Sequence, residues 1–131
     1  MFSIQDDLNL NYSFFRIMRQ HYRAFLSTPM NERKIDMAKG YWIVRVSVHN
    51  AAEYPSYLAA ARPAFEKFGA RFLVRGGAFE CMEGVARERN VVVEFADVAT
   101  ARACYQSEEY GLAKAIRQRV ADADFVIVEG A

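Results

Sequence analysis

The sequence predicts one α+β domain with the element order β-α-β-β-α-β, preceded by an N-terminal helical extension. Three observations favour this fold class. The length of 131 residues suits one ordinary domain, and a content of 53% hydrophobic and 25% charged residues is typical of globular proteins. Segments with a two-residue period alternate with segments that repeat every three or four residues. We place the domain at residues 37–131 and the extension at residues 1–36.

The extension carries a pattern that is typical of an amphipathic helix. Apolar side chains recur every three or four residues over positions 12–26, and Ser-Thr-Pro at 27–29 then indicates a turn, because proline cannot continue a helix. A second interpretation is that residues 1–36 were read from upstream of the true start, since Met37 is a natural beginning for the domain. Sequence alone leaves both interpretations open.

The domain begins with a strand and a helix. Residues 41–48 alternate between apolar and polar side chains, which is the period of a strand. Asn50 is expected to cap a helix that ends at Gly69. Pro63 lies inside this helix, where it removes a backbone donor and crowds the preceding turn, so we expect a kink or a break there.

Two strands follow the helix. Residues 71–83 are expected to form one bent strand, because the pair Gly76-Gly77 permits a bulge or a positive φ. Residues 91–95 are rich in β-branched side chains, which are typical of a central strand.

The last third of the domain contains two helices and a strand. Asp97 and Ser107 are expected to cap successive helices, the second of which continues to Val120. The final strand covers residues 125–129. With its helices on one face of the sheet, this order of elements is that of the ferredoxin-like fold.

One face of the predicted sheet has no element to cover it. Its side chains are largely apolar, and large exposed apolar patches are rare on monomers. We therefore expect this chain to pair with a second copy of itself, sheet against sheet, as a homodimer. The residues expected on this face are Tyr41, Ile43, Leu73, Val92, Val126 and Val128.

Charge, cysteine content and hydropathy argue against several classes of protein. A formal net charge of +1 argues against nucleic acid as a partner. Cys81 and Cys104 lack a CxxC spacing and are expected in the core; His21 and His49 lack neighbouring ligands, so we expect no metal. No apolar run approaches the roughly 20 residues of a membrane span, and the N-terminus lacks a basic signal region, which predicts a cytoplasmic protein without a membrane partner.

Polar residues on the uncovered face supply the candidate site. Alternation places Arg45, Arg75 and Glu94 there, although the position of Arg75 depends on the bend at the glycine pair. Buried charges must be paired or offered to a ligand. Two interpretations follow: an arginine–glutamate lattice that fixes the register of the dimer, or an anion pocket in which an arginine binds a carboxylate and Glu94 acts as a base. His49 is a second candidate base, or else a solvated loop residue.

Five segments together resemble the domain-of-unknown-function family DUF1330. The resemblance spans residues 37–131 in order and implies a dimeric α/β-barrel, in which two ferredoxin-like sheets face each other. It implies no established activity. Relatives by fold include antibiotic-biosynthesis-type monooxygenases and chlorite-dismutase-like haem proteins, but a shared fold does not transfer function. The segments are KGYWI at 39–43, RFLVRGG at 71–77, VVVEF at 91–95, YQSEEY at 105–110 and DFVIVEG at 124–130.

Two functions are therefore expected from the sequence. The first is binding or conversion of a small organic anion without a metal or organic cofactor. The alternative is a non-catalytic dimeric module for structure or interaction. They differ in whether Arg45, Arg75 and Glu94 surround an open pocket or close on one another across the dimer.

Overall fold

A computed structural model describes residues 16, 18–20, 23 and 38–131. By its internal contacts the chain divides into two units, Met1–Asp36 and Met37–Ala131. The described residues of the first unit are helical. The rest of the helix expected over residues 12–26, and the alternative interpretation of residues 1–36, lie outside the described residues.

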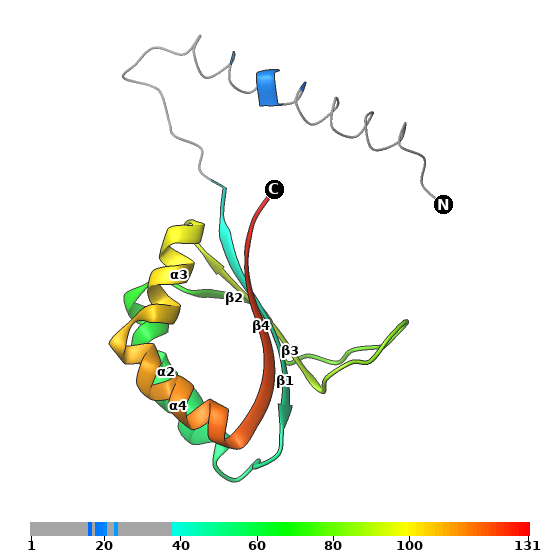
Figure 1. Cartoon of the computed structure of the whole chain (residues 1–131), viewed down its shortest axis with the longest axis vertical. Coiled ribbons are helices and arrows are strands. Elements are labelled where there is room, and N and C mark those ends of the chain that lie inside the picture. The colour runs from blue at the N-terminus through cyan, green and yellow to red at the C-terminus, as the bar shows by residue number, and fades with distance from the viewer. Residues whose placement is uncertain (1–15, 17, 21–22, 24–37) are drawn as a thin grey trace. The chain divides into compact units, whose positions relative to one another are not determined.

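The second unit is a four-stranded antiparallel sheet with helices on one face (Figure 1). The strands lie in the order β2-β3-β1-β4. Together with the β-α-β-β-α-β sequence of elements, this order confirms the predicted ferredoxin-like fold. The strands are β1 (Gly40–Val48), β2 (Arg71–Arg75), β3 (Arg89–Phe95) and β4 (Ala121–Glu129), and the helices are α2 (Tyr54–Lys67), α3 (Val98–Gln106) and α4 (Glu108–Val120).

The two predicted caps at α3 and α4 are confirmed. The Asp97 carboxylate accepts hydrogen bonds of 2.7 Å from both the hydroxyl and the backbone N–H of Thr100, and these bonds lower the pKa of Asp97. The Ser107 hydroxyl oxygen accepts a hydrogen bond of 3.2 Å from the backbone N–H of Tyr110. Because Ser107 is extended, it ends α3 and begins α4 at one residue.

Two local expectations are wrong, and one alternative of a third is wrong. Asn50 does not cap α2: its side-chain oxygen accepts from the Glu53 backbone N–H at 3.2 Å, which caps a turn before the helix. Pro63 does not break α2: the helix continues through it, because its buried face packs on the core on both sides of the proline. Residues 78–83 belong to no strand.

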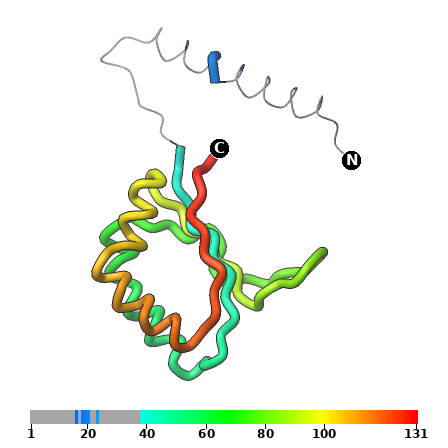
Figure 2. The backbone as a smooth tube through the Cα atoms, viewed as in Figure 1, coloured from blue at the N-terminus to red at the C-terminus, as the bar shows by residue number. Residues whose placement is uncertain are grey.

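The segment between β2 and β3, residues 76–88, forms an arm that projects from the sheet on the side away from the helices (Figure 1 and Figure 2). Gly76 turns the chain out of β2 with a φ of 68°, a conformation that glycine adopts without strain. The arm exposes Phe79 together with Met82 and Val85, the last two with 83% and 89% of their surface accessible. We call this segment the β2–β3 arm.

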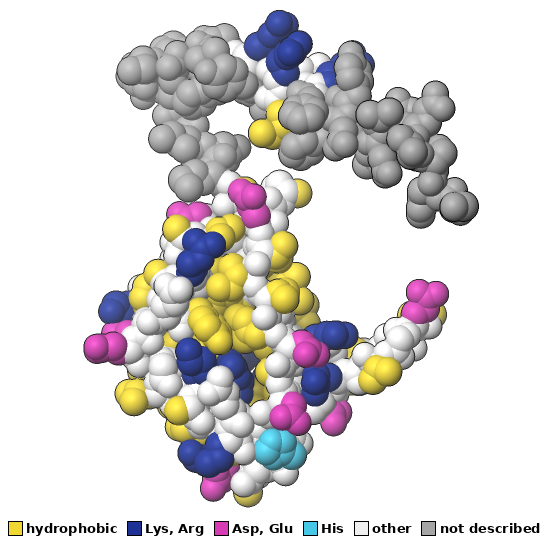
Figure 3. Space-filling model, viewed as in Figure 1, with side chains coloured by type: hydrophobic (Ala, Val, Ile, Leu, Met, Phe, Trp, Pro, Cys, Tyr) yellow, Lys and Arg dark blue, Asp and Glu magenta, His cyan; other side chains and the backbone are white. Residues whose placement is uncertain are grey.

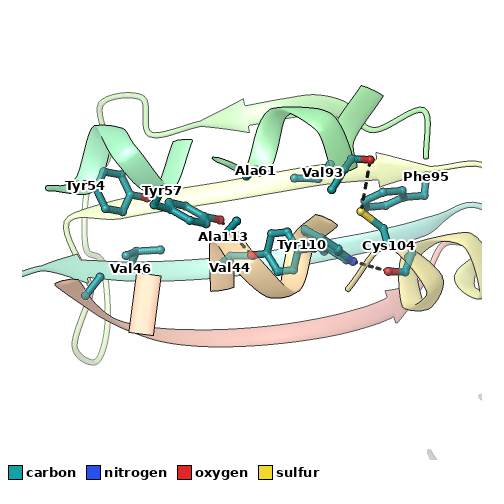
Figure 4. Close-up of a cluster of buried hydrophobic side chains, with 14 of the residues drawn as sticks. Val44, Val46, Tyr54, Tyr57, Ala61, Val93, Phe95, Cys104, Tyr110 and Ala113 are labelled. Carbon is teal, nitrogen blue, oxygen red and sulfur yellow. Dashed lines mark hydrogen bonds between the residues drawn. The ribbon is translucent and has the colours of Figure 1, made fainter. Parts of the chain in front are cut away.

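The core lies between the helices and one face of the sheet. Trp42 is at its centre, and its indole N–H donates a 2.8 Å hydrogen bond to the Ala101 carbonyl. Figure 4 shows Val44, Val46 and Val93 on the strands that face the helices. The alternation predicted for β1 is therefore confirmed. Five aromatic rings surround Trp42 with centroid distances of 4.9 to 6.1 Å: Phe65, Phe95, Tyr105, Tyr110 and Phe125.

Within the described part of the chain, no helix combines the length and the apolar character that crossing a bilayer requires.

Candidate functional site

The face of the sheet turned away from the helices, which we call the open face, holds two of the predicted site residues, Arg45 and Glu94. The Glu94 carboxylate accepts a hydrogen bond of 3.1 Å from the hydroxyl of Tyr41. The Arg45 guanidinium lies 3.5 Å from the carboxylate of Asp124. Arg45 and Glu94 therefore have different partners within one chain, and an arginine–glutamate lattice between the two chains of a dimer stays a prediction.

Asp124 joins a second arginine on the same face. Arg87, at the base of the β2–β3 arm, donates from Nε to the Asp124 carboxylate at 2.8 Å and from Nη1 to the hydroxyl of Ser47 at 3.0 Å. The hydrogen bond from Arg87 lowers the pKa of Asp124. Ion pairing on the open face thus involves Asp124 rather than Glu94.

The expected position of Arg75 on the open face is wrong. The pairing between β2 and β3 shifts register between Phe72 and Val74, which makes Leu73 an extra residue in the strand. A shift of one residue moves the following side chains to the opposite face of a sheet. Arg75 consequently lies on the same side as Phe72, toward the helices, and its guanidinium is 4.3 Å from the centroid of the Phe72 ring.

His49 is exposed in the loop after β1. Its backbone N–H donates to the Val120 carbonyl at 3.0 Å, which fixes the start of this loop. The His49 side chain lines neither of the two hollows described below. The structure therefore does not bring His49 together with Arg75 or Glu94.

A small cavity of about 30 Å³ lies between the sheet and the helices, and we call it the inner cavity. This volume accommodates a group about the size of one water molecule. Figure 3 shows apolar side chains between the helices and the sheet, with basic side chains beside them. The polar residues that line the inner cavity are Tyr54, Tyr57, Arg75 and Arg89, and the remaining lining is apolar apart from the Trp42 indole.

Arg89 brings a buried donor without a partner to the inner cavity. Its Nε is buried and forms no hydrogen bond with any described residue. The guanidinium lies 5.6 Å from the centroid of the Tyr54 ring, and it occupies space that a side chain at position 76 would fill, so Gly76 is needed there. Leaving a buried donor unpaired costs about 1–3 kcal/mol, and more when the group is charged.

Arg117, on α4, is a buried arginine with 4% of its surface exposed. Its carbon Cζ lies 5.2 Å from the ring centroid of Phe125 and 5.9 Å from that of Tyr57. Among the described residues, no ion pair includes Arg75, Arg89 or Arg117. This end of the core therefore gathers positive charge that no described carboxylate neutralises.

Hydrogen bonds connect Arg117 with the inner cavity through two tyrosines. Arg117 Nη1 donates to the hydroxyl of Tyr110. The oxygen of this hydroxyl lies 3.0 Å from that of Tyr57, and Figure 4 shows both tyrosines. Either hydroxyl can donate in the bond between Tyr57 and Tyr110. When Tyr110 is the donor, Tyr57 keeps its own proton for an acceptor in the cavity that it lines.

Burial keeps the neighbouring phenols protonated. It raises the pKa of Tyr110, and it also raises the pKa of Tyr54, where the nearby Arg89 opposes the effect. Both side chains are thus neutral hydrogen-bonding groups at neutral pH. Positive charge at the site comes from the arginines alone, and an anion there meets no competing phenolate.

A larger groove of about 450 Å³ opens beside the inner cavity, and we call it the outer groove. It is lined by α2 and β2, and it shares Leu58, Phe65, Phe72 and Arg75 with the inner cavity. The two hollows are therefore neighbours with a common wall. The other residues that line the outer groove are Pro55, Ala59, Arg62, Glu66 and Ala70.

Cysteine and histidine build no metal centre in the parts of the chain that are described. There, no three side chains of histidine, cysteine, aspartate or glutamate lie in positions that could hold a metal ion. Cys104 is buried in the core as predicted, and burial raises the pKa of its thiol to about 12. Cys81 is exposed on the β2–β3 arm, so the expectation that it is a core residue is wrong.

Sequence patterns carry a weak signal for Arg89 and Arg117. Arg89 is an even number of residues from the buried Val93 in β3, so alternation places both side chains on the same face. Arg117 lies three or four residues from Ala113 and Val120, which are both on the buried stripe of α4. A basic residue on a buried stripe is unusual, because arginine is rarely buried without a partner. That mismatch is the feature that could have identified the site.

The fold and the site define the class: a ferredoxin-like α+β protein with an arginine-rich cavity between its sheet and its helices. Residues 39–131 match the model of the family described as a domain of unknown function, DUF1330. The chain belongs to this family, which confirms the resemblance of its five segments.

Solved structures of two bacterial proteins have a similar fold. A protein of unknown function from Rhodopseudomonas palustris is 17% identical with a TM-score of 0.60, and the match covers 72% of this chain and 83% of that one. SnoaB from Streptomyces nogalater, described as a cofactor-independent oxygenase, is 14% identical with a TM-score of 0.51, over 72% of this chain and 94% of that one. Identities this low show the fold alone. No curated protein matches this sequence.

Proposed function

We propose that this protein binds a small organic anion in the inner cavity. The observation that carries the proposal is the buried Nε of Arg89, which has no hydrogen-bond partner among the described residues. Arg75 and Arg117 add positive charge nearby without an ion pair in the described part of the chain. A carboxylate or a similar oxyanion supplies both the missing acceptor and the missing counter-charge.

The proposed anion site includes one of the two arginines expected from the sequence and excludes the other. Arg75 belongs to the inner cavity, whereas Arg45 and Glu94 lie on the open face. Catalysis by Glu94 or His49 stays a prediction, and neither residue lines the cavity. The group best placed to assist a reaction is the Tyr57 hydroxyl, which can donate a hydrogen bond to negative charge that develops on a bound substrate.

We propose that binding, and any conversion that follows it, uses no metal or organic cofactor. SnoaB, a protein of similar fold, is described as a cofactor-independent oxygenase, which supports this form of the proposal. The balanced net charge supports a protein without nucleic-acid or membrane partners, and we propose a cytoplasmic location.

We also propose that the open face packs against the open face of a second copy. It exposes apolar side chains of β1, β2 and β4, including Val126 with 53% of its surface accessible, and no helix within residues 38–131 packs over it. It also carries both arginines and carboxylates, which a two-fold axis can bring opposite one another. A non-catalytic dimeric module, the alternative function, would use this same surface.

Calorimetric titration of the full-length protein with small carboxylates tests the anion site. The wild type should bind one anion per chain, and Arg89→Gln should weaken binding roughly 10- to 100-fold, because a hydrogen bond to a charged group contributes about 1.5–3 kcal/mol. Arg102→Gln is the matched control, since Arg102 is an exposed arginine of α3 that lines neither hollow. Equal affinities for the wild type and Arg89→Gln would contradict the proposal.

A further inference from the structure

We infer that the anion is a monocarboxylate with an apolar tail, and that the tail lies in the outer groove along α2. The inference rests on the proposed function and specifies the class of ligand. It starts from the different sizes of the two hollows, about 30 Å³ for the inner cavity and about 450 Å³ for the outer groove. The inner cavity has room for about one carboxylate oxygen, so the rest of the ligand must extend into the outer groove.

The common wall provides a path between the two hollows. Phe65 and Phe72 belong to both, and their rings pack edge to face with centroids 5.0 Å apart. Leu58 also lines both. A ligand whose carboxylate reaches Arg89 thus passes over apolar surface as it leaves the inner cavity. Removing that surface from water favours a hydrocarbon or aromatic body there.

Arg75 marks the boundary between the polar and the apolar part of the site. It lines both hollows, and it stacks on Phe72 instead of pairing with a described carboxylate. From this position its guanidinium can contact the outer oxygen of a carboxylate whose other oxygen faces Arg89. The two arginines then hold one carboxylate from two sides, which leaves the rest of the ligand in the groove.

The charges of the outer groove argue against a second carboxylate on the ligand. Arg62 and Glu66 both line the groove, one turn apart on α2, so their charges offset each other. Beyond Arg75 the groove therefore has no net positive charge. A dicarboxylate would place its second charge against an apolar surface and beside Glu66, which is unfavourable.

Titration of the full-length protein with straight-chain acids of increasing length tests this inference. We expect affinity to rise from acetate through butanoate and hexanoate to octanoate, by roughly fourfold for each added methylene group that becomes buried. Octanedioate should bind more weakly than octanoate. Arg89→Gln should weaken the binding of every member of the series, which distinguishes the site from non-specific adsorption of longer acids.

A variant of the groove separates the tail from the carboxylate. Ala59 is exposed on α2 and lines the outer groove, so Ala59→Trp should fill the groove without disturbing the core. It should reduce the affinity for octanoate to that for acetate and leave acetate binding unchanged. Ala115→Trp, at an exposed alanine of α4 that lines neither hollow, is the matched control and should bind both acids as the wild type does.

The outcomes distinguish this inference from the proposed function. If acetate and octanoate bind equally well and both depend on Arg89, the inference of an apolar tail is overturned, while the proposed anion site remains supported. The placement of the tail in the outer groove is likewise overturned if Ala59→Trp binds octanoate as tightly as the wild type. If no acid binds, or if binding ignores Arg89, the proposed function fails and the inference fails with it.

Discussion

The hydroxyl oxygen of Tyr57 lies 3.0 Å from that of Tyr110, and this hydrogen bond links α2 to α4 inside the core. Tyr110 is the central member of the network, because it also accepts from the buried Arg117. Helix packing and the polar end of the cavity therefore depend on the same group, and changing it should affect both stability and binding.

We expect Tyr110→Phe to lower the free energy of unfolding by about 2 kcal/mol, since it leaves the buried Arg117 donor without its acceptor. Urea denaturation followed by circular dichroism measures the change. Tyr105→Phe is the control: the Tyr105 hydroxyl makes no hydrogen bond with a described residue, so its loss should change stability by less than about 0.5 kcal/mol. Equal losses for the two variants would show that the Tyr110 hydroxyl has no special role.

Gly76→Ala should both destabilise the protein and weaken anion binding. The residue has a φ of 68°, where a side chain costs roughly 1–2 kcal/mol, and the new methyl group would collide with the guanidinium of Arg89. Gly84→Ala isolates the second effect, because Gly84 has a φ of 77° but no atom near its missing side chain. Calorimetry should show weaker carboxylate binding for Gly76→Ala only, and unchanged affinity in both variants would contradict the placement of Arg89.

Stability should decrease at acid pH. The pKa values of Asp97, Glu109 and Asp124 are lowered by hydrogen bonds from Thr100, Lys67 and Arg87 respectively. A carboxyl group whose pKa is lower in the folded state stabilises that state above its unfolded pKa of about 4, and this contribution is lost as the pH falls through the folded value. Thermal melts between pH 7 and pH 2 should therefore shift to lower temperature below about pH 4.

Asp97→Asn tests the contribution of the carboxylate that caps α3 to this loss of stability at acid pH. Asparagine can still cap the helix, but it does not titrate, so the variant should lose less stability between pH 5 and pH 2 than the wild type. Glu80→Gln, at an exposed carboxylate on the β2–β3 arm, should keep the wild-type profile. An identical acid slope for Asp97→Asn and the wild type would rule out this contribution.

The open face should hold two copies together. Light scattering of the wild type at micromolar concentration should give twice the chain mass of 14.9 kDa. Val126→Asp should give a folded monomer, because it places a carboxylate in the proposed interface at a side chain that the single copy leaves exposed. Leu112→Asp, at an exposed leucine of α4, should remain dimeric. A wild type that is monomeric at this concentration would contradict the dimer.

The fold was predictable from the sequence to the extent that its signals are local. The alternation of β1 and the caps at Asp97 and Ser107 each depend on a few neighbouring residues, and the structure confirms them. Pro63 shows the limit of such signals. Taken alone it indicates a break, but the packing of the apolar face of α2 outweighs the loss of one backbone hydrogen bond.

The candidate site was less predictable because its residues meet only through tertiary structure. Arg89 and Arg117 are separated along the chain, yet both act on Tyr54 because β3 and α4 pack on the same core. The burial of Arg117 and of the Arg89 Nε, which makes these residues unusual, is not visible in a list of residue types. Arg45 and Glu94 share the open face as alternation indicates, yet their partners depend on the strand register, which brings Asp124 beside Arg45 and Tyr41 beside Glu94.

The bulge at Leu73 determines which side of the sheet the following charge occupies. If Leu73 were paired in a regular ladder, alternation would carry Arg75 to the open face and remove it from the cavity, while the strand order stayed the same. A protein of this fold could thus exchange a basic pocket for a basic outer surface by losing one bulge, with no substitution at all. Comparisons between such proteins should therefore align β2 by its pairing with β3, since an error of one position would assign the arginine to the wrong compartment.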